Sequence, residues 1–248
     1  MAKLIYIVGM GPGDESFFTG QAKNAIEQSE IVIGYTVYVE LMKKFYPEKC
    51  YRTTGMKKEV ERCELCLKLA EEGRTVALIC SGDAGVYGLA SLMYELRPED
   101  SEIELVVVPG ITAANSGAAV LGAPLNHDYC VISLSDLMTP WEVIEKRIIA
   151  AIQGDFSMAL YNPSSHKRVD YLQKACDIML SAGASPERAC GYVENIGREG
   201  TSATTCTLQE LRDCEVNMFT TVFIGNSMTF IRENHLVTPR GYLTKTER

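Results

Sequence analysis

The chain has 248 residues, which is enough to bury a substantial core and favours two compact halves over one. Hydrophobic residues make up 46% of it and charged residues 23%, as in folded globular proteins, so disordered and fibrous classes are excluded. The formal net charge of -8 disfavours nucleic acid as a partner, and a polyanionic substrate would need a local basic cluster.

The start of the chain predicts a strand and a glycine turn rather than the basic leader and apolar core of a secretory signal. We therefore expect a cytoplasmic protein. Residues 105–123 are uncharged, but Pro109, Asn115 and Ser116 interrupt them. A buried strand, a turn and a helix of small residues explain this segment better than a membrane span, so no membrane partner is expected.

Short apolar runs alternate with amphipathic segments in the first half. They predict strands at 4–8, 30–34, 75–80 and 103–108, and helices at 19–28, 57–72 and 86–96. This βαβ alternation is typical of a mostly parallel sheet. Glycine-rich turns at 9–14, 81–88 and 109–117 follow three of the strands. Because ligands bind beyond the carboxyl ends of parallel strands, we expect these turns to line one crevice.

A second alternating series begins at Tyr129. It predicts strands at 130–135, 157–161, 188–194, 201–206 and 220–225, and helices at 140–152 and 166–182. Short turns separate the late strands, so the second sheet is expected to be mixed. We predict an N-terminal α/β domain at 1–117 and a C-terminal α/β domain at 118–248.

Nine cysteines, an odd number, are spread along the chain, which favours reduced thiols over a disulfide framework. Cys63 and Cys66 form the only CxxC pair. A metal or cluster site would need more ligands at matching spacing, so no metal is expected.

The first glycine turn resembles a dinucleotide-binding loop only in part. Gly9 and Gly11 fit GxGxxG, but Asp14 occupies the third glycine position, where its carboxylate would oppose a pyrophosphate. No glycine precedes Lys and Ser or Thr at P-loop spacing. A cofactor with a sulfonium, an amino acid group and an adenosine, but no phosphate, suits these turns and the acids Asp14 and Asp83. S-adenosylmethionine has those features; plain βα connection geometry is the alternative for each turn.

Five segments together resemble the tetrapyrrole (corrin/porphyrin) methylase family. They are GMGPGD at 9–14, SGDAGVYG at 81–88, VPGITAANSGAAVLGAPLNHDYCVISLSDLMTPW at 108–141, YNPSS at 161–165 and TPRGY at 238–242. The long middle segment and TPRGY are similar to the precorrin-3B and cobalt-precorrin-3 C-17 methyltransferase branch. Where many relatives have the tripeptide Gly-Asp-Pro, this chain has Gly82, Asp83 and Ala84.

The resemblance implies two α/β domains in a homodimer, with S-adenosylmethionine in the cleft between the domains and a tetrapyrrole as substrate. The implied reaction methylates C-17 with ring contraction in cobalamin biosynthesis and leaves S-adenosylhomocysteine. The implied cofactor contacts are Pro12, Ser81, Gly82, Asp83, Val86, Thr112, Ala113, Tyr161, Asn162, Gly191 and Phe223. Whether the ring already holds cobalt is open, although the segment ending SLSDLMTPW is more similar to the cobalt-containing, anaerobic members.

Methyl transfer from a sulfonium needs a positioned acceptor carbon in a dry site and no nucleophilic side chain. Ring contraction needs proton transfer as well. His127 and Asp128 are our candidates for the general acid or base, with Ser133, Ser135 and Asp136 as nearby polar partners. Turn and helix-cap roles are the alternative for these residues.

Arginines are expected to bind the carboxylates of a tetrapyrrole, and Arg240 and Arg168 are the candidates. Lys146 and Arg147 are explained equally well as a solvated helix face. Three other functions are left open: a non-catalytic adenosyl-binding module, a cousin acting on uroporphyrinogen, precorrin-2 or diphthine, and a nicotinamide oxidoreductase, which Asp14 argues against.

Overall fold

The structure is a computed structural model that describes residues 3–165 and 168–242. The chain divides into two compact units, Met1–Thr112 and Ala113–Arg248. Both units are α/β, as predicted. The predicted domain boundary after residue 117 falls inside a helix, α5 (Ala113–Leu121), and all of that helix belongs to the second unit.

The first unit contains a parallel sheet of five strands in the order β3-β2-β4-β1-β5. Its strands are β1 (Leu4–Gly9), β2 (Ile31–Tyr35), β3 (Cys50–Thr54), β4 (Val76–Cys80) and β5 (Glu104–Val108). The predicted parallel sheet is therefore confirmed. Strand β3 was not predicted, because its sequence CYRTT lacks an apolar run.

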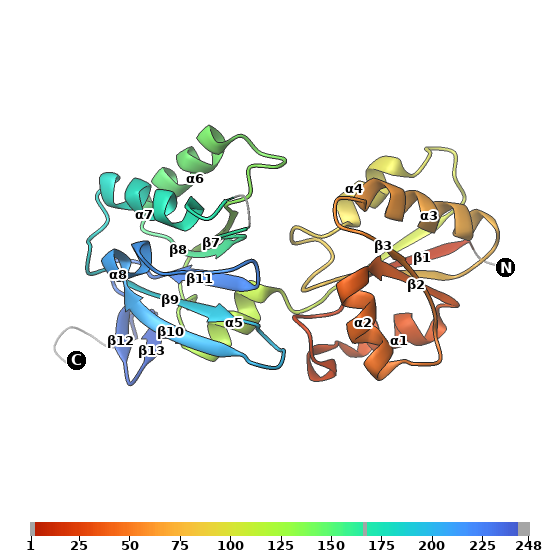
Figure 1. Ribbon diagram of the computed structural model, residues 1–248, viewed down its shortest axis with the longest axis horizontal. Helices are drawn as coiled ribbons and strands as arrows, with labels where there is room; N and C mark the ends of the chain where they lie inside the picture. The colour runs from red at the N-terminus through yellow and green to blue at the C-terminus, as the bar shows by residue number, and fades with distance from the viewer. Residues whose placement is uncertain (1–2, 166–167, 243–248) are drawn as a thin grey trace. The chain divides into compact units, whose positions relative to one another are not determined.

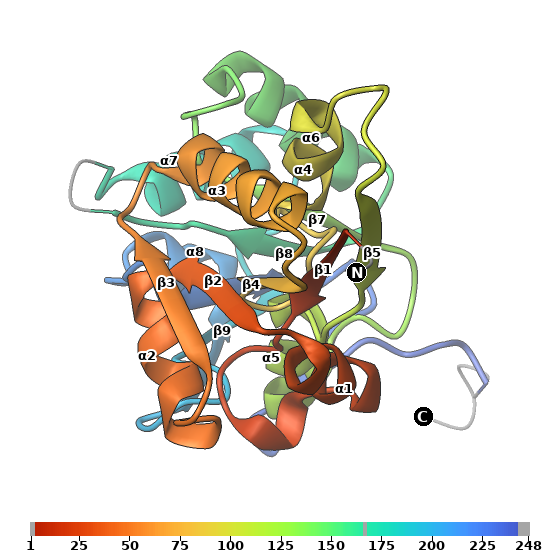
Figure 2. The same ribbon diagram turned by 90° about the vertical axis from the view of Figure 1, so that its right-hand side faces the viewer.

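Helices cover both faces of this sheet (Figure 2). They are the short 3-10 helix η1 (Glu15–Phe17), α1 (Gly20–Gln28), α2 (Thr36–Phe45), α3 (Glu59–Glu71) and α4 (Ala90–Leu96). Helices α1 and α2 bury Ala25 and Met42 against one face, and α3 and α4 bury Cys63 and Met93 against the other. Helix α2 was not predicted, because it follows β2 directly with no side-chain cap at Tyr35.

The second unit contains a mixed sheet of five strands in the order β10-β9-β11-β8-β7, as predicted. The strands are β7 (Tyr129–Ser133), β8 (Ser157–Tyr161), β9 (Ala189–Glu194), β10 (Ser202–Thr207) and β11 (Thr220–Ile224). Strands β7 and β8 are parallel, and the other pairs are antiparallel. A small sheet joins β12 (Phe230–Arg232), β13 (His235–Val237) and β6 (Gly122–Ala123).

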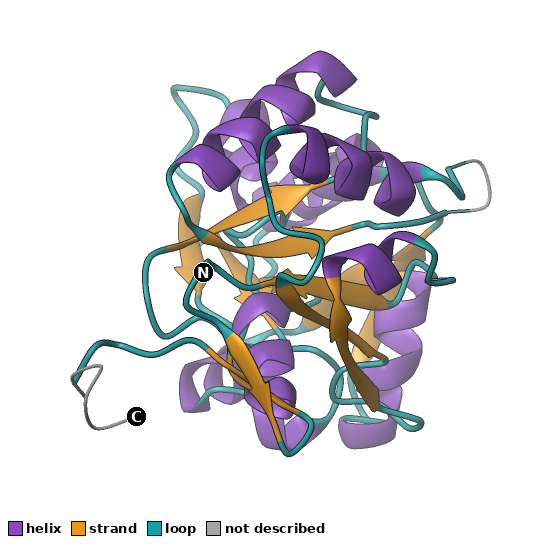
Figure 3. Cartoon of the chain, turned by 90° about the vertical axis from the view of Figure 1, so that its left-hand side faces the viewer, coloured by secondary structure: helices purple, strands orange, loops and turns teal. Residues whose placement is uncertain are grey.

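In this unit α6 (Trp141–Gln153) and α7 (Tyr171–Ser181) lie on one face of the sheet and α5 on the other (Figures 1 and 3). The short helix α8 (Leu208–Arg212) packs with α7. The helix predicted at 166–182 begins only at Tyr171, and residues 166 and 167 lie outside the described part. No helix in residues 3–165 and 168–242 is long and apolar enough to cross a membrane.

Successive residues of the central strands face opposite sides of the sheet and therefore pack against different helices. On β8 and β11, Leu160 and Val222 face α6 and α7, whereas Ala159 and Phe223 face α5. A Cβ atom on Gly117 of α5 would lie 2.8 Å from the Phe223 ring. The small residues of α5 therefore let the helix approach a large buried aromatic side chain closely.

All nine cysteines are free thiols. Cys63 and Cys66 lie on the buried face of α3. Burial raises the pKa of Cys63 to about 12 and that of Cys66 well above its ordinary value. The CxxC pair is therefore protonated at neutral pH and packs as a pair of small apolar side chains.

A polar network at the turn after α6 joins it to the end of β11. Asp155 has a φ of 53° and accepts hydrogen bonds from the Ser227 N–H at 2.8 Å and the Ser227 hydroxyl at 2.6 Å. The buried guanidinium of Arg188 lies 3.0 Å from the same carboxylate. Burial alone would raise the pKa of Asp155, but the bonds from Ser227 and the charge of Arg188 bring it below the ordinary value.

We expect Asp155→Asn to lower the free energy of unfolding at neutral pH by about 1 kcal/mol, a figure that allows for solvent screening. Asparagine tolerates the positive φ, so the change isolates the charge. Because the folded-state pKa is depressed, the contribution exists above the unfolded pKa and is lost as pH falls through the folded one. Urea unfolding should show the difference from wild type shrinking below the ordinary pKa of 3.8.

Asp100→Asn is the matched control, since Asp100 is an exposed acid with no side-chain hydrogen bond or ion pair among the described residues, and the stability of this variant should follow wild type at every pH. A stability difference for Asp155→Asn that persists unchanged into acid would contradict the role of the ionised carboxylate.

Candidate functional site

Three glycine turns of the first unit meet beyond the carboxyl ends of β4, β1 and β5, which are neighbours in the sheet. A Cβ atom on Gly110 would lie 2.1 Å from the Gly82 oxygen and 2.6 Å from the Gly9 carbonyl carbon. Gly11 and Gly82 exchange two backbone hydrogen bonds, at 3.0 and 2.7 Å. Contact this close between backbones excludes any side chain, so these glycines are required by the packing of the turns.

The Asp83 carboxylate holds two of these turns in place. One oxygen accepts hydrogen bonds from the N–H groups of Gly85 at 2.7 Å and Val86 at 3.1 Å. The other oxygen accepts from the N–H of Gly110 at 2.9 Å. Asp83 therefore fixes the backbone around it, and its negative charge stays at the carboxyl edge of the sheet.

The charge of these turns decides which class of cofactor they fit. Residues 9–14, 81–88 and 109–113 include no Lys or Arg. Asp14 caps the 3-10 helix by accepting from the Ser16 N–H at 2.8 Å, and hydrogen bonding by Ser16 lowers the pKa of Asp14. Two ionised acids without a cation in the turns oppose a pyrophosphate and suit a cofactor with a positive sulfonium.

Tyr87 is a feature of these turns that the sequence analysis missed. Its φ is 55°, a rare conformation for a bulky residue, and 58% of it is exposed. Gly88 follows so tightly that a Cβ there would lie 2.2 Å from the Ala84 oxygen. Helix α4, predicted from residue 86, therefore begins only at Ala90. The sequence signal for this turn was an aromatic residue between two closely spaced glycines, Gly85 and Gly88.

Arg62 was also missed. It lies on α3, is only 4% exposed, and donates to the Thr54 hydroxyl at 2.8 Å and to the Gly55 carbonyl at 3.0 Å. No carboxylate in the described part of the chain pairs with it. Since Thr54 ends β3, Arg62 adds a permanent positive charge at the same edge of the sheet as the glycine turns.

In the second unit a polar group lies at the carboxyl ends of β7 and β8. The Tyr161 hydroxyl accepts from the Ala114 N–H at 2.7 Å. Asn162, with a φ of 55°, donates from Nδ2 to the Ser133 hydroxyl at 2.9 Å, and the Ser135 N–H donates to the same hydroxyl at 3.2 Å. The structure thus brings together the predicted residues Tyr161, Asn162 and Ser135.

Arg168 lies close to the same strand ends but is already paired. Its Nε is 2.5 Å from Asp136, whose other oxygen accepts from the Tyr171 hydroxyl at 2.6 Å. The bond from Tyr171 and the Arg168 charge lower the pKa of Asp136. Asp136 therefore fixes the position of the guanidinium, which is a predicted ligand of substrate carboxylates.

The remaining predicted cofactor contacts differ in their exposure. Pro12, Gly82 and Gly191 are buried, and Ser81, Asp83, Val86, Thr112 and Ala113 are half-buried. Phe223 is 0% exposed, pairs with Gly191 in the sheet and packs in the core against α5. Its side chain offers no surface to a ligand in this arrangement.

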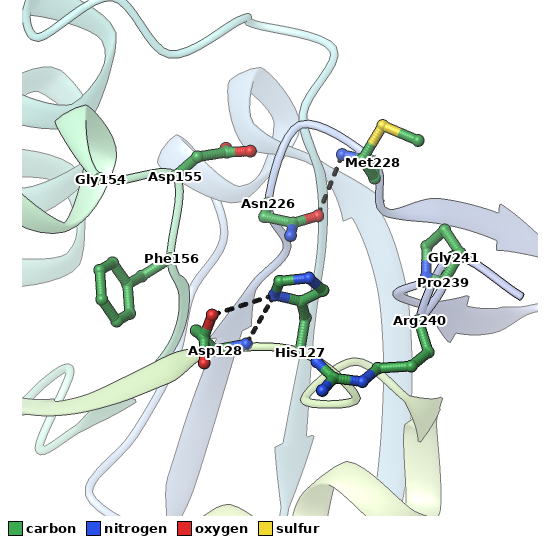
Figure 4. A pocket seen from close by; sticks show the side chains of 10 residues that line it. All are labelled: His127, Asp128, Gly154, Asp155, Phe156, Asn226, Met228, Pro239, Arg240 and Gly241. Atoms are coloured by element: carbon green, nitrogen blue, oxygen red, sulfur yellow. Dashed lines mark hydrogen bonds and ion pairs between the residues drawn. The ribbon is translucent and has the colours of Figure 1, made fainter.

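The predicted residues His127, Asp128 and Arg240 do not lie with the polar group at the carboxyl ends of β7 and β8. They line a cavity of about 310 Å³ together with residues 154–156, Asn226, Met228, Pro239 and Gly241 (Figure 4). This cavity lies at the edge of the second sheet where β7 and β8 begin. Ser133 ends β7 and Ser135 follows it, so a five-residue strand of roughly 16 Å separates this pair from His127 and Asp128. The expectation that they are partners of His127 and Asp128 is therefore wrong.

The His127 ring is bonded to the backbone of the next residue. Its Nδ1 accepts from the Asp128 N–H at 2.8 Å, so the ring proton is on Nε2. The Asp128 carboxylate lies 3.4 Å from the same Nδ1 and would become an ion-pair partner only after protonation of the ring.

Comparisons with known proteins agree with the fold. Residues 4–212 match the family described as Tetrapyrrole (Corrin/Porphyrin) Methylases. The crystal structure of the methyltransferase CobJ has a TM-score of 0.87 and 33% sequence identity to this chain, and covers 95% of this chain and 99% of its own.

Two curated relatives are similar over nearly all of this chain. The cobalt-factor III methyltransferase of Priestia megaterium is 45% identical over 97% of this chain, which spans 45% of that protein's length. The probable cobalt-factor III C(17)-methyltransferase of Salmonella typhimurium is 43% identical over 96% of this chain and 99% of its own. The chain belongs to the tetrapyrrole (corrin/porphyrin) methylase family.

Proposed function

We propose that this protein transfers a methyl group from S-adenosylmethionine to C-17 of cobalt-factor III in cobalamin biosynthesis. The observation that carries the proposal is the end-to-end similarity to the Salmonella relative of that name. The branch-specific segments 108–141 and 238–242 support it independently. Ring contraction accompanies methyl transfer in this proposal, as the family resemblance implies.

The cofactor would contact the first unit at Pro12, at Ser81, Gly82, Asp83 and Val86, and at Thr112. This set fits because the turns hold two acids, no cation and closely packed backbone. S-adenosylmethionine, when bound, supplies a methyl group on a positively charged sulfur. The turns' part is to hold the cofactor rigidly, since rigid positioning lowers the entropic cost of reaching the attack geometry.

The second unit would contribute Ala113, Tyr161 and Asn162, with Gly191 and Phe223 acting through the packing behind them. The hydrogen bond from the Ala114 N–H fixes the Tyr161 ring, and the bond from Asn162 to Ser133 fixes the amide. Ser135 is the proposed polar partner in proton transfer, because it lies in this group. His127 and Asp128 lie at the opposite edge, which argues against their role as general acid or base.

Substrate carboxylates would be bound by Arg168, whose orientation Asp136 and Tyr171 maintain. The proposal includes a homodimer that works in the cytoplasm without nucleic acid or membrane partners. The family resemblance supports the homodimer, and the acidic net charge of -8 argues against a nucleic-acid partner. Light scattering on the purified protein checks the dimer.

The direct test is an anaerobic incubation with methyl-labelled S-adenosylmethionine and, in parallel, cobalt-factor III, cobalt-precorrin-3 and metal-free precorrin-3B. Products are identified by mass and absorption spectra. We expect label in a cobalt-containing substrate. Label only in precorrin-3B would indicate the metal-free route, and label in uroporphyrinogen or precorrin-2 would indicate another family step. Bound cofactor without transfer to any of them would favour a non-catalytic binding module.

Asp83→Ala should weaken binding of S-adenosylhomocysteine about tenfold or more, because three N–H groups lose their acceptor and the turns are no longer held together. Asp83→Asn should lose less, since its amide oxygen still accepts from two of them. Calorimetric titration measures both affinities. Asp100→Ala, outside the turns, is the control; if Asp83→Ala binds as that control does, the carboxylate is dispensable.

Arg168→Gln should raise the KM for the tetrapyrrole about tenfold, which corresponds to the loss of one charge-assisted hydrogen bond, and leave cofactor affinity unchanged. Arg147→Gln is the matched control, because Arg147 is exposed on α6. Steady-state kinetics at saturating cofactor give the KM. Equal loss of both affinities would indicate misfolding, and an unchanged KM would remove Arg168 from substrate binding.

A further inference from the structure

The cavity at the amino edge of the second sheet combines segments that are far apart in the sequence. Residues 127–128 precede β7, 154–156 follow α6, 226–228 follow β11 and 239–241 follow β13 (Figure 4). The cavity lies at the opposite edge from Tyr161 and Asn162, so the proposed methyl transfer does not use it. Its volume of about 310 Å³ is roughly ten times the share of one water molecule, which leaves room for a small organic molecule.

Asn226 presents a buried hydrogen-bond donor to this cavity. The residue is 5% exposed, and its side-chain oxygen accepts from the Met228 N–H at 3.0 Å and from the Thr229 hydroxyl at 3.1 Å. These two bonds fix which end of the amide is oxygen. The Nδ2 end has no partner in the described part of the chain, and it points toward His127 (Figure 4).

His127 and Arg240 provide two more donors. With the ring proton of His127 on Nε2, that N–H lies on the Asn226 side of the ring (Figure 4). Arg240 lines the same cavity, and its guanidinium has no carboxylate partner among the described residues. A guanidinium, an imidazole N–H and an amide N–H therefore converge on one space.

The acids of the cavity do not cancel these donors. Asp155 is already bonded to Ser227 and paired with Arg188. The Asp128 side chain is 77% exposed, so solvent screens its charge. The space therefore offers unused donors and few unused acceptors, an arrangement that suits an anion.

We propose that this cavity is a second ligand site, which binds a small organic anion through its carboxylate or phosphate group. Arg240 supplies the charge, and Asn226 and His127 direct N–H groups at the anionic oxygens. This assignment explains why Arg240, within the branch-specific segment 238–242, lies with His127 and Asn226 at the amino edge of the second sheet.

The test is calorimetric titration of the full chain with citrate and, separately, inorganic phosphate, each against sodium chloride of matched ionic strength. The two arms distinguish a carboxylate from a phosphate ligand. We expect saturable binding of at least one anion. Absence of saturable binding of either up to about 10 mM would overturn the proposal.

Two variants locate the site. Arg240→Gln and Asn226→Asp should each weaken binding about tenfold or more. Asn226→Asp keeps the oxygen that accepts from Met228 and Thr229, so the fold is maintained while a donor becomes a negative charge. Arg232→Gln is the matched control, since Arg232 is exposed on β12 and lies over the Phe230 ring. Equal loss in the control, or undiminished binding in both variants, would place the anion elsewhere and reject the site.

Discussion

The contact between Gly9, Gly82 and Gly110 is the constraint on which the rest of the first unit depends. Three strand ends are brought so close that no Cβ fits between them, and the Asp83 carboxylate accepts hydrogen bonds from three N–H groups of the turns. Other features follow from this closure. The turn after β4 is so tight that Tyr87 takes a positive φ, and α4 starts later than its sequence pattern suggests.

Strand direction sorts the polar residues of the second unit into two groups. Because β7 and β8 are parallel, their carboxyl ends gather Ser133, Tyr161 and Asn162, and their amino ends gather His127 and Asp155. One sheet therefore carries two chemically different edges. The carboxyl edge lies where ligands of open α/β sheets bind, and the amino edge is rich in hydrogen-bond donors.

The fold was predictable where burial leaves a clear pattern of apolar residues in the sequence. Fully buried runs such as β4 and β8 are visible as continuous apolar segments, whereas β3, with the sequence CYRTT, is not. The candidate site was harder to predict. His127 and Ser135 are near in sequence, but an extended strand separates them, and sequence distance says nothing about which edge a residue reaches. The burial of Phe223 depends on how closely α5 packs, which no local pattern encodes.

Because the net charge is -8, only local positive charge can attract a substrate with many carboxylates. That local charge depends on whether each arginine is already paired with an acid. Arg168 and Arg188 are each held by an aspartate, so an incoming carboxylate finds an oriented but partly neutralised guanidinium. Buried Arg62 lacks such a partner and keeps its full charge at the carboxyl edge of the first sheet. An arginine fixed by an aspartate, as Arg168 is by Asp136, selects a ligand by geometry more than by charge.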